Sequence, residues 1–244
     1  MKMTGHLLFE KWQKAGGISK SKFPIFKQDS KAKSKTVSQP KQAWISTEAG
    51  AMRDDPGNRF IRLMFIFTDA TQLALCDMRR FAKVGLYPSK GIEERREIGP
   101  LGPEPLGADF TPATLSAILR NNTIRPIKQF LLDQTKIAGI GNIYSDEMLF
   151  RAGIHPRRRP CSLTAKEVKN LHTAMRAVLR EGMDFGGDSY IDYRNIDGLR
   201  GRFQGEHRAY RRTGKPCKQR GCKGVIQREI IGGRSAHYCS EHQR

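Results

Sequence analysis

Residues 124–156 read IRPIKQFLLDQTKIAGIGNIYSDEMLFRAGIHP, and they predict two helices joined by a glycine-containing turn. The second helix starts near Asn142 and stops by Gly153. Two glycines one residue apart, Gly139 and Gly141, let the backbone turn sharply and approach another molecule closely. The Asn142 side chain and the free amides of the following helix N-terminus then suit a phosphate. A helix–turn–helix corner with a capping asparagine explains the same residues equally well.

Helix signals continue on both sides of this segment. Thr111 followed by Pro112 is an N-cap and first-turn pair, and the apolar run 124–132 forms the next helix. Thr164 and Glu167 form a capping box, which opens a longer helix. The apolar residues of that helix recur about every 3.6 residues, which indicates ordinary core packing and not a cofactor site. They are Val168, Leu171, Met175, Val178 and Leu179.

The charge of the chain points to a polyanionic partner. Of the 244 residues, 44 are Lys or Arg and 24 are Asp or Glu, which gives a formal net charge of +20. Nucleic acid is the commonest such partner, and an anionic membrane surface is the rival. No apolar run reaches the roughly eighteen residues that a spanning helix needs, and the N-terminus lacks a signal-peptide pattern. We therefore expect a cytoplasmic, nucleoid-associated protein.

Four potential metal ligands stand in two pairs near the end of the sequence. Cys217 and Cys222 are separated by four residues. After sixteen more residues, Cys239 and His242 are separated by two. Two such pairs joined by a short arm meet the requirements of a tetrahedral structural zinc site. The arm predicts two strands around Gly232-Gly233, and it is too short to bury a core without the metal. Scattered free thiols and a surface histidine are the alternative.

The N-terminal part predicts strands and a basic insertion. The segments 60–67 and 72–75 form a hairpin around 68–71. Residues 13–58 are rich in Lys, Ser and Gln, which predicts a loop that is flexible at least in part. This loop is either functionally idle or a nonspecific phosphate-binding segment. The Pro- and Gly-rich stretch 99–106 marks a domain boundary.

Several of these motifs resemble, in the same order, those of the formamidopyrimidine-DNA glycosylase family. The segment 124–156 resembles its helix–two-turn–helix, and LGPEPL at 101–106 resembles its linker. DMRRF at 77–81 is similar to its Asp-Pro-Arg-Arg-Phe loop, with Met78 in place of proline. KMTGHL at 2–7 resembles its Met-Ser-Gly turn, and the C-terminal hairpin resembles its zinc finger. The resemblance covers the whole chain apart from the Lys-rich insertion.

The resemblance implies an α+β fold in three parts and an activity in base-excision DNA repair. The parts are a partial β-sandwich at 1–100, a helix–two-turn–helix domain at 107–205 with a lesion-capping loop at about 186–204, and a zinc-bound β-hairpin at 206–244. The family flips an oxidised purine out of duplex DNA, cuts the glycosidic bond and nicks the strand by β- and δ-elimination. The expected partner is damaged double-stranded DNA, the expected cofactor is one structural zinc ion, and the expected state is a monomer.

The resemblance also assigns roles to individual positions. Asn142 and Lys128 match positions near the phosphates that flank the lesion. Arg234 matches the finger arginine, which grips a phosphate and donates a proton in the second elimination. The trio that fills the space left by the flipped base is matched by Met3, Arg79 and Phe81. A methionine that fills a gap in the core is the alternative for Met3. The metal ligands are Cys217, Cys222, Cys239 and His242.

The sequence departs from the family pattern at two places. The family's nucleophile is the proline of an N-terminal Pro-Glu-Leu-Pro-Glu-Val start, and the adjacent glutamate and a later lysine transfer protons. None of these three groups has a match here, because the sequence begins at the Met-Ser-Gly turn. We expect a piece of a longer active enzyme; a short protein that binds damaged DNA without cutting it, or a zinc protein that binds RNA, are the alternatives. In addition, His242 replaces the family's fourth cysteine.

Overall fold

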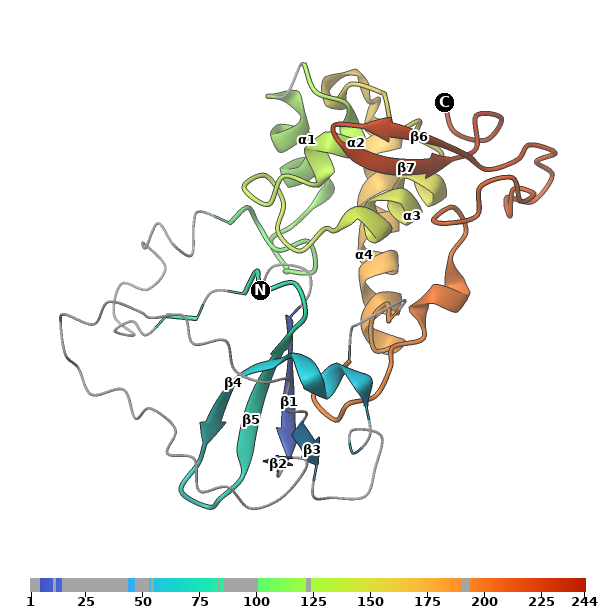
Figure 1. Cartoon of the computed structure of the whole chain (residues 1–244). Coiled ribbons are helices and arrows are strands. Elements are labelled where there is room, and N and C mark those ends of the chain that lie inside the picture. Colours follow the sequence, from blue (N-terminus) through green and yellow to red (C-terminus); the bar gives the residue numbers. More distant parts are fainter. Residues whose placement is uncertain are drawn as a thin grey trace. The chain divides into compact units, whose positions relative to one another are not determined.

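The computed structural model describes residues 5–10, 12–14, 44–46, 53, 55–82, 84–85, 101–121, 124–189 and 194–244 (Figure 1). The chain divides into two compact units. The first comprises Met1–Val84 and Gly187–Gly201, and the second comprises Gly85–Gly186 and Arg202–Arg244. Met3, most of the Lys-rich insertion and four residues of the predicted capping loop lie outside the described residues. The domain boundary near residue 100 stays a prediction.

The first unit contains a three-stranded antiparallel sheet in the order β1-β5-β4. β1 spans Gly5–Glu10, β4 spans Ile61–Ile66 and β5 spans Gln72–Asp77. The predicted hairpin is confirmed, since β4 pairs with β5 across a turn at 68–71. In this turn the Asp69 carboxylate accepts hydrogen bonds from the Thr71 amide and hydroxyl at 2.9 and 2.6 Å. A side chain that bonds the backbone two residues ahead is a frequent way to close such a turn.

Smaller elements accompany this sheet. β2 (Trp12–Lys14) pairs with β3 (Trp44–Ser46), and a 3-10 helix, η1, spans Pro56–Phe60. A small apolar cluster of Ile61, Ala74 and Cys76 is buried between β4 and β5, while Phe65 and Phe67 are exposed.

The second unit contains the helices and the C-terminal hairpin (Figure 1). The helices are α1 (Pro112–Arg120), α2 (Ile127–Leu131), α3 (Asn142–Ala152) and α4 (Ala165–Asp184), with 3-10 turns η3 (Pro160–Ser162) and η4 (Phe203–Glu206). The hairpin consists of β6 (Gln227–Ile231) and β7 (Arg234–Tyr238), which pair antiparallel as the sequence of the arm predicts.

The caps of α1 and α4 confirm the predicted helix starts. Thr111 accepts a hydrogen bond at the N-terminus of α1. Thr164 and Glu167 form the complete capping box of α4, in which the Glu167 carboxylate accepts from the Thr164 amide at 2.7 Å. Helix α2 begins later than predicted, at Ile127. The reason is Pro126, because a proline disfavours the helical conformation for the residue before it.

One apolar core joins the four helices of this unit. Leu115 of α1, Phe130 of α2, Leu149 of α3 and Leu171 of α4 are each at most 1% exposed within it. The predicted stripe of α4 faces this core, which confirms its packing role. The described residues therefore combine a helical region with small antiparallel sheets, and the predicted α+β class is confirmed.

Candidate nucleic-acid interface and metal centre

The turn before α3 is built around two glycines. Gly139 has φ +78°, a conformation that L side chains rarely adopt. The Gln134 carboxamide oxygen stabilises this turn by accepting a hydrogen bond from the Gly139 amide at 2.8 Å. Gly141 is the N-cap residue, and among the described residues no side chain caps α3. A Cβ atom at either glycine would meet no atom within 4 Å. The N-terminus of α3 is therefore accessible to an anion.

Asn142 lies inside the helix instead of capping it. It is the first residue of α3, and its Nδ2 donates to the Ser235 hydroxyl of β7 at 3.3 Å. Its Oδ1 is buried and has no hydrogen-bond partner among the described residues. The capping-asparagine alternative therefore does not describe this turn. Instead, the Asn142 side chain connects the start of α3 to the C-terminal hairpin.

The turn of the hairpin lies against α2 and the start of α3. A Cβ atom at Gly232 would come within 2.8 Å of the Gln129 side chain of α2, so only glycine fits there without displacing a neighbour. Arg234 is exposed at the first position of β7, next to Ser235. Figure 1 shows β7 running beside α3. Arg234 and Asn142, two predicted phosphate contacts, are thus brought close to one helix N-terminus.

Lys128 lies below this surface. Its side chain is fully buried, and its amine donates to the Asn142 carbonyl oxygen at 3.0 Å, the Ser145 hydroxyl at 2.9 Å and the Asp146 carboxylate at 2.5 Å. Burial lowers the pKa of Lys128, while the Asp146 carboxylate opposes this effect. Direct contact with a phosphate would require the amine to leave these three acceptors.

Two buried acids on α3 join this helix to neighbouring segments, and sequence reasoning missed both. Asp146 accepts from Lys128 through one oxygen, and through the other it accepts from the amide and the ring of His237 at 3.1 and 2.9 Å. Glu147 accepts three backbone amides of the segment 208–210 at 2.8, 3.0 and 2.8 Å. The signal in the sequence was two adjacent acids directly before the apolar run Met148-Leu149-Phe150 of the same helix, where buried charges require partners.

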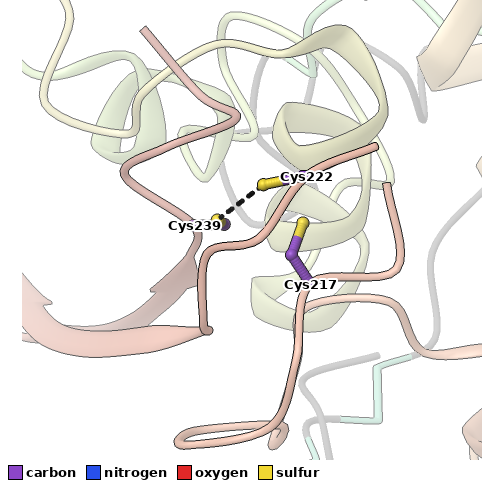
Figure 2. Close-up of side chains that lie close together, drawn as sticks. All are labelled: Cys217, Cys222 and Cys239. Atoms are coloured by element: carbon purple, nitrogen blue, oxygen red, sulfur yellow. Dashed lines mark hydrogen bonds between the residues drawn. The ribbon is translucent and has the colours of Figure 1, made fainter. Parts of the chain in front are cut away.

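Three cysteines form the candidate metal centre (Figure 2). The ligand atoms of Cys217, Cys222 and Cys239 all lie within 4.8 Å of one another, and the Sγ atoms of Cys222 and Cys239 are 3.7 Å apart. Zinc–sulfur bonds of about 2.3 Å in a tetrahedron place two sulfurs about 3.8 Å apart, so this pair fits zinc without rearrangement. Burial raises the pKa of Cys217 to about 12, so a cation that binds here must displace protons.

His242 is not gathered with the three cysteines. Its Nε2 lies 2.6 Å from the Phe150 carbonyl oxygen near the end of α3, and its ring packs edge-on against the Phe150 ring at 4.8 Å. The structure thus brings together three of the four predicted ligands. The Phe150 carbonyl oxygen, which also accepts from the Gly153 amide at 3.1 Å, keeps the His242 ring at the end of α3.

The DMRRF segment of the first unit forms a preorganised exposed turn. The Asp77 carboxylate accepts from the amides of Arg79, Arg80 and Ala82 at 3.2, 3.0 and 2.7 Å, and Arg80 has φ +57°. The Arg79 guanidinium lies 4.8 Å from the centroid of the Phe81 ring, and both side chains are exposed. An arginine beside an apolar ring, held on a rigid turn, is suited to contact a base step.

Part of the predicted capping loop is tied to the same unit. Arg194 is buried and donates to the Asp55 carboxylate at 2.8 Å, which joins the loop to the start of η1. Asn195 accepts from the Asp197 and Leu199 amides at 3.1 and 2.7 Å, which closes a local turn.

None of the helices in the described ranges combines the length and apolar character that membrane crossing requires.

Comparison with known proteins decides the family. A family model described as the formamidopyrimidine-DNA glycosylase H2TH domain matches residues 101–193. The formamidopyrimidine-DNA glycosylase of Geobacillus kaustophilus is 41% identical over 190 residues, which cover 78% of this chain and 68% of that protein. The Bacillus subtilis enzyme is 39% identical over 192 residues, with coverages of 78% and 68%. The chain belongs to the formamidopyrimidine-DNA glycosylase family.

Solved structures of this glycosylase family agree with the fold. The MutM (Fpg) protein of Thermus thermophilus matches with a TM-score of 0.68 and 38% identity, over 75% of this chain and 68% of that one. Lactococcus lactis Fpg in complex with DNA containing an abasic site matches with a TM-score of 0.72 and 26% identity, over 100% and 73%. The family resemblance of the sequence is thereby confirmed. The chain spans about two thirds of the length of these curated glycosylase relatives.

Proposed function

We propose that this protein binds damaged duplex DNA in base-excision repair. We propose further that it acts as a DNA glycosylase and AP lyase that removes oxidised purines. One observation carries the proposal. The start of α3 has no side-chain cap, and its first residue, Asn142, is hydrogen-bonded to Ser235, the neighbour of Arg234 on β7. Open helix amides, a carboxamide and a guanidinium are donors that together match a phosphate. The net charge of +20 adds long-range attraction to the DNA backbone.

The solved relatives support the choice of lesion. Solved structures contain Lactococcus lactis Fpg with abasic-site DNA, a mutant of that protein with Fapy-dG DNA, and MutM with carbocyclic 8-oxo-G DNA. In our proposal, Arg79 and Phe81 enter the space left by the flipped base, as their exposed and stacked arrangement allows. Met3 completes this trio. Arg234 holds a phosphate and supplies the proton of the second elimination.

A structural zinc ion is part of the proposal. Cys217, Cys222 and Cys239 supply three thiolates, and His242 supplies the fourth ligand after its ring turns away from the Phe150 carbonyl oxygen. Cys3His is an accepted structural zinc set, and such a closed site stabilises a fold without taking part in the reaction. The ion would fix the loops at the base of the hairpin that carries Arg234.

The binding experiment uses the 244-residue protein with zinc and a fluorescent duplex that contains a tetrahydrofuran abasic analogue. We expect tighter binding to this duplex than to the undamaged duplex, with affinity that falls steeply as salt rises, because phosphate contacts release counterions. The Arg234→Ala variant is expected to lower both the affinity and the salt slope. Equal affinity for both duplexes, or a flat salt response, would refute the proposal.

The second candidate function is binding of damaged DNA without cutting. The observation in its favour is that no Pro-Glu-Leu-Pro-Glu stretch occurs in these 244 residues. An 8-oxoguanine duplex incubated with this chain, and with the chain extended by its upstream coding sequence, separates the two functions. Nicking and a borohydride-trapped adduct with the extended chain support the enzyme. Binding without nicking or an adduct from either protein supports the binding module.

A further inference from the structure

A buried hydrogen-bond network connects three elements below the candidate DNA surface. Lys128 comes from α2, Asp146 from α3 and His237 from β7. All three side chains are at most 5% exposed. The two oxygens of Asp146 divide between the two partners, since Oδ1 accepts from Lys128 and Oδ2 accepts from His237. One carboxylate thus holds an adjacent helix and the hairpin at the same time.

The network is linked to the candidate DNA surface through two elements, the first turn of α3 and strand β7. On one side, the Lys128 amine also donates to the Asn142 carbonyl oxygen and the Ser145 hydroxyl, which fixes the first turn of α3. On the other side, His237 lies three residues beyond Arg234 on the same strand. Both its amide and its ring are bonded to Asp146, so β7 cannot slide along α3 without breaking two hydrogen bonds. A strand shifted by one residue would turn each side chain to the opposite face.

We propose that Lys128, Asp146 and His237 are positioning residues that hold Arg234 and Asn142 in register, so that both bind one DNA phosphate. This inference rests on the proposed function. It changes the role expected for Lys128, which acts through the elements it joins and not by contact with DNA. The Asn142–Ser235 hydrogen bond reports this alignment nearer the surface, because it joins the start of α3 to β7.

A purely stabilising role is the competing explanation. Buried ion pairs contribute little net stability compared with apolar residues of the same volume, but removal of one partner leaves a charge without compensation. A loss of stability alone therefore does not separate the two roles. An energetic coupling between His237 and Arg234 in DNA binding does separate the two roles. If the network positions Arg234, the contribution of Arg234 to DNA affinity depends on the network being intact.

The experiment measures binding of the zinc-loaded 244-residue protein to the tetrahydrofuran duplex by fluorescence anisotropy. His237→Phe removes the ring donor but keeps an aromatic ring against Tyr210, which His237 contacts at 4.9 Å. His237→Asn restores a donor near the position of Nδ1. Glu181→Gln is the matched control, because it breaks the Arg151–Glu181 pair between α3 and α4, which includes no hairpin residue. Zinc content and melting temperature are measured for every variant.

We expect His237→Phe to weaken binding about tenfold and His237→Asn to recover most of it. Arg234→Ala should weaken wild-type binding about tenfold but the His237→Phe variant less than about twofold. Asp146→Asn, whose side chain lies on α3, repeats the test if His237→Phe loses zinc. Glu181→Gln should retain wild-type affinity despite a lower melting temperature.

Two results would overturn the inference. The first is an equal effect of Arg234→Ala in the wild-type and network-variant backgrounds, which means that the network only stabilises the fold. The second is a loss of affinity in Glu181→Gln that matches the loss in His237→Phe at equal melting temperature. A wild-type protein that does not prefer the damaged duplex would instead refute the proposed function itself, and this inference with it.

Discussion

Gly139 and Gly141 are one residue apart, but the structure gives them different roles. Gly139 has φ +78°, whereas Gly141 has φ −99°, which any residue adopts. We predict that Gly139→Ala lowers the free energy of unfolding by about 1 kcal/mol, because a Cβ atom is strained at positive φ. Gly141→Ala should cost less stability, because alanine is a poorer N-cap residue but is not strained at this φ. It should weaken DNA binding, since its Cβ atom points into the open space before α3.

Urea denaturation and DNA anisotropy of both variants check this prediction. Each variant is the control of the other, because both add a single methyl group to the same turn. Equal losses of stability in the two variants would contradict the assignment of backbone strain to Gly139. Wild-type DNA affinity in Gly141→Ala would show that no ligand approaches this amide closely.

Glu147 is a structural residue although it is charged. Its carboxylate is fully buried and accepts three backbone amides of 208–210. We predict that Glu147→Gln lowers the free energy of unfolding by about 2–3 kcal/mol, because hydrogen bonds to a charged acceptor are the strong ones and one amide would then face an NH2 group. Urea denaturation measures this loss, and Glu104→Gln is the exposed control. A similar small loss in both variants would contradict the prediction.

At the scale of elements, a bidentate ion pair ties α3 to α4. Arg151 donates to both carboxylate oxygens of Glu181 at 2.6 Å. These hydrogen bonds lower the pKa of Glu181 below its ordinary value near 4.5. The unfolded chain therefore binds the proton more readily than the folded protein does. The stabilisation by this group is present above pH 4.5 and is lost as the pH falls through the lowered value.

We predict that Glu181→Gln destabilises the protein at pH 7 and that its difference from the wild type shrinks below about pH 4.5. The size of the effect is modest, because the Glu181 side chain is partly exposed and solvent screens the pair. Urea denaturation at pH 7 and pH 4 measures it. Arg151→Gln should give the same pH dependence. A difference that is equal at both pH values would exclude the ion pair as its cause.

The elements with local signals were predictable from the sequence, whereas the contacts between elements were not. The Thr111 and Thr164 caps and the apolar stripe of α4 follow from residues within one or two turns. The glycine pair before α3 was also predictable. The roles of Lys128 and Asp146 depend on which helix and strand face them, and one sequence contains no signal for that choice. The sequence alone does not distinguish a buried lysine from an exposed lysine that binds a phosphate.

At the scale of the whole molecule, the metal centre and the helical core are separate clusters of the second unit. The cysteines pack with Phe150, Ala209 and Ile226, while the main core joins α1 to α4. Short metal-bound segments owe much of their folding free energy to the ion, whereas a large apolar core does not. This separation predicts that the two parts respond differently to removal of the metal.

We predict that chelation of zinc abolishes binding to damaged DNA while most of the helical circular dichroism signal persists. The physical reason is that the hairpin loses its fixed base and no longer holds Arg234 near Asn142, whereas the core of α1 to α4 stays packed. Cys217→Ser should behave like the chelated protein. Cys161→Ser is the control, because Cys161 is an exposed cysteine outside the cluster.

Metal analysis, circular dichroism and DNA anisotropy are measured on the same samples, before and after zinc is restored. Recovery of binding with added zinc separates loss of the ion from irreversible damage. Full DNA affinity in protein shown to be free of metal would refute the role of the cysteines in holding the hairpin. Loss of the helical signal together with DNA binding would mean that the two clusters fold as one cooperative unit, because removal of the ion would then unfold both.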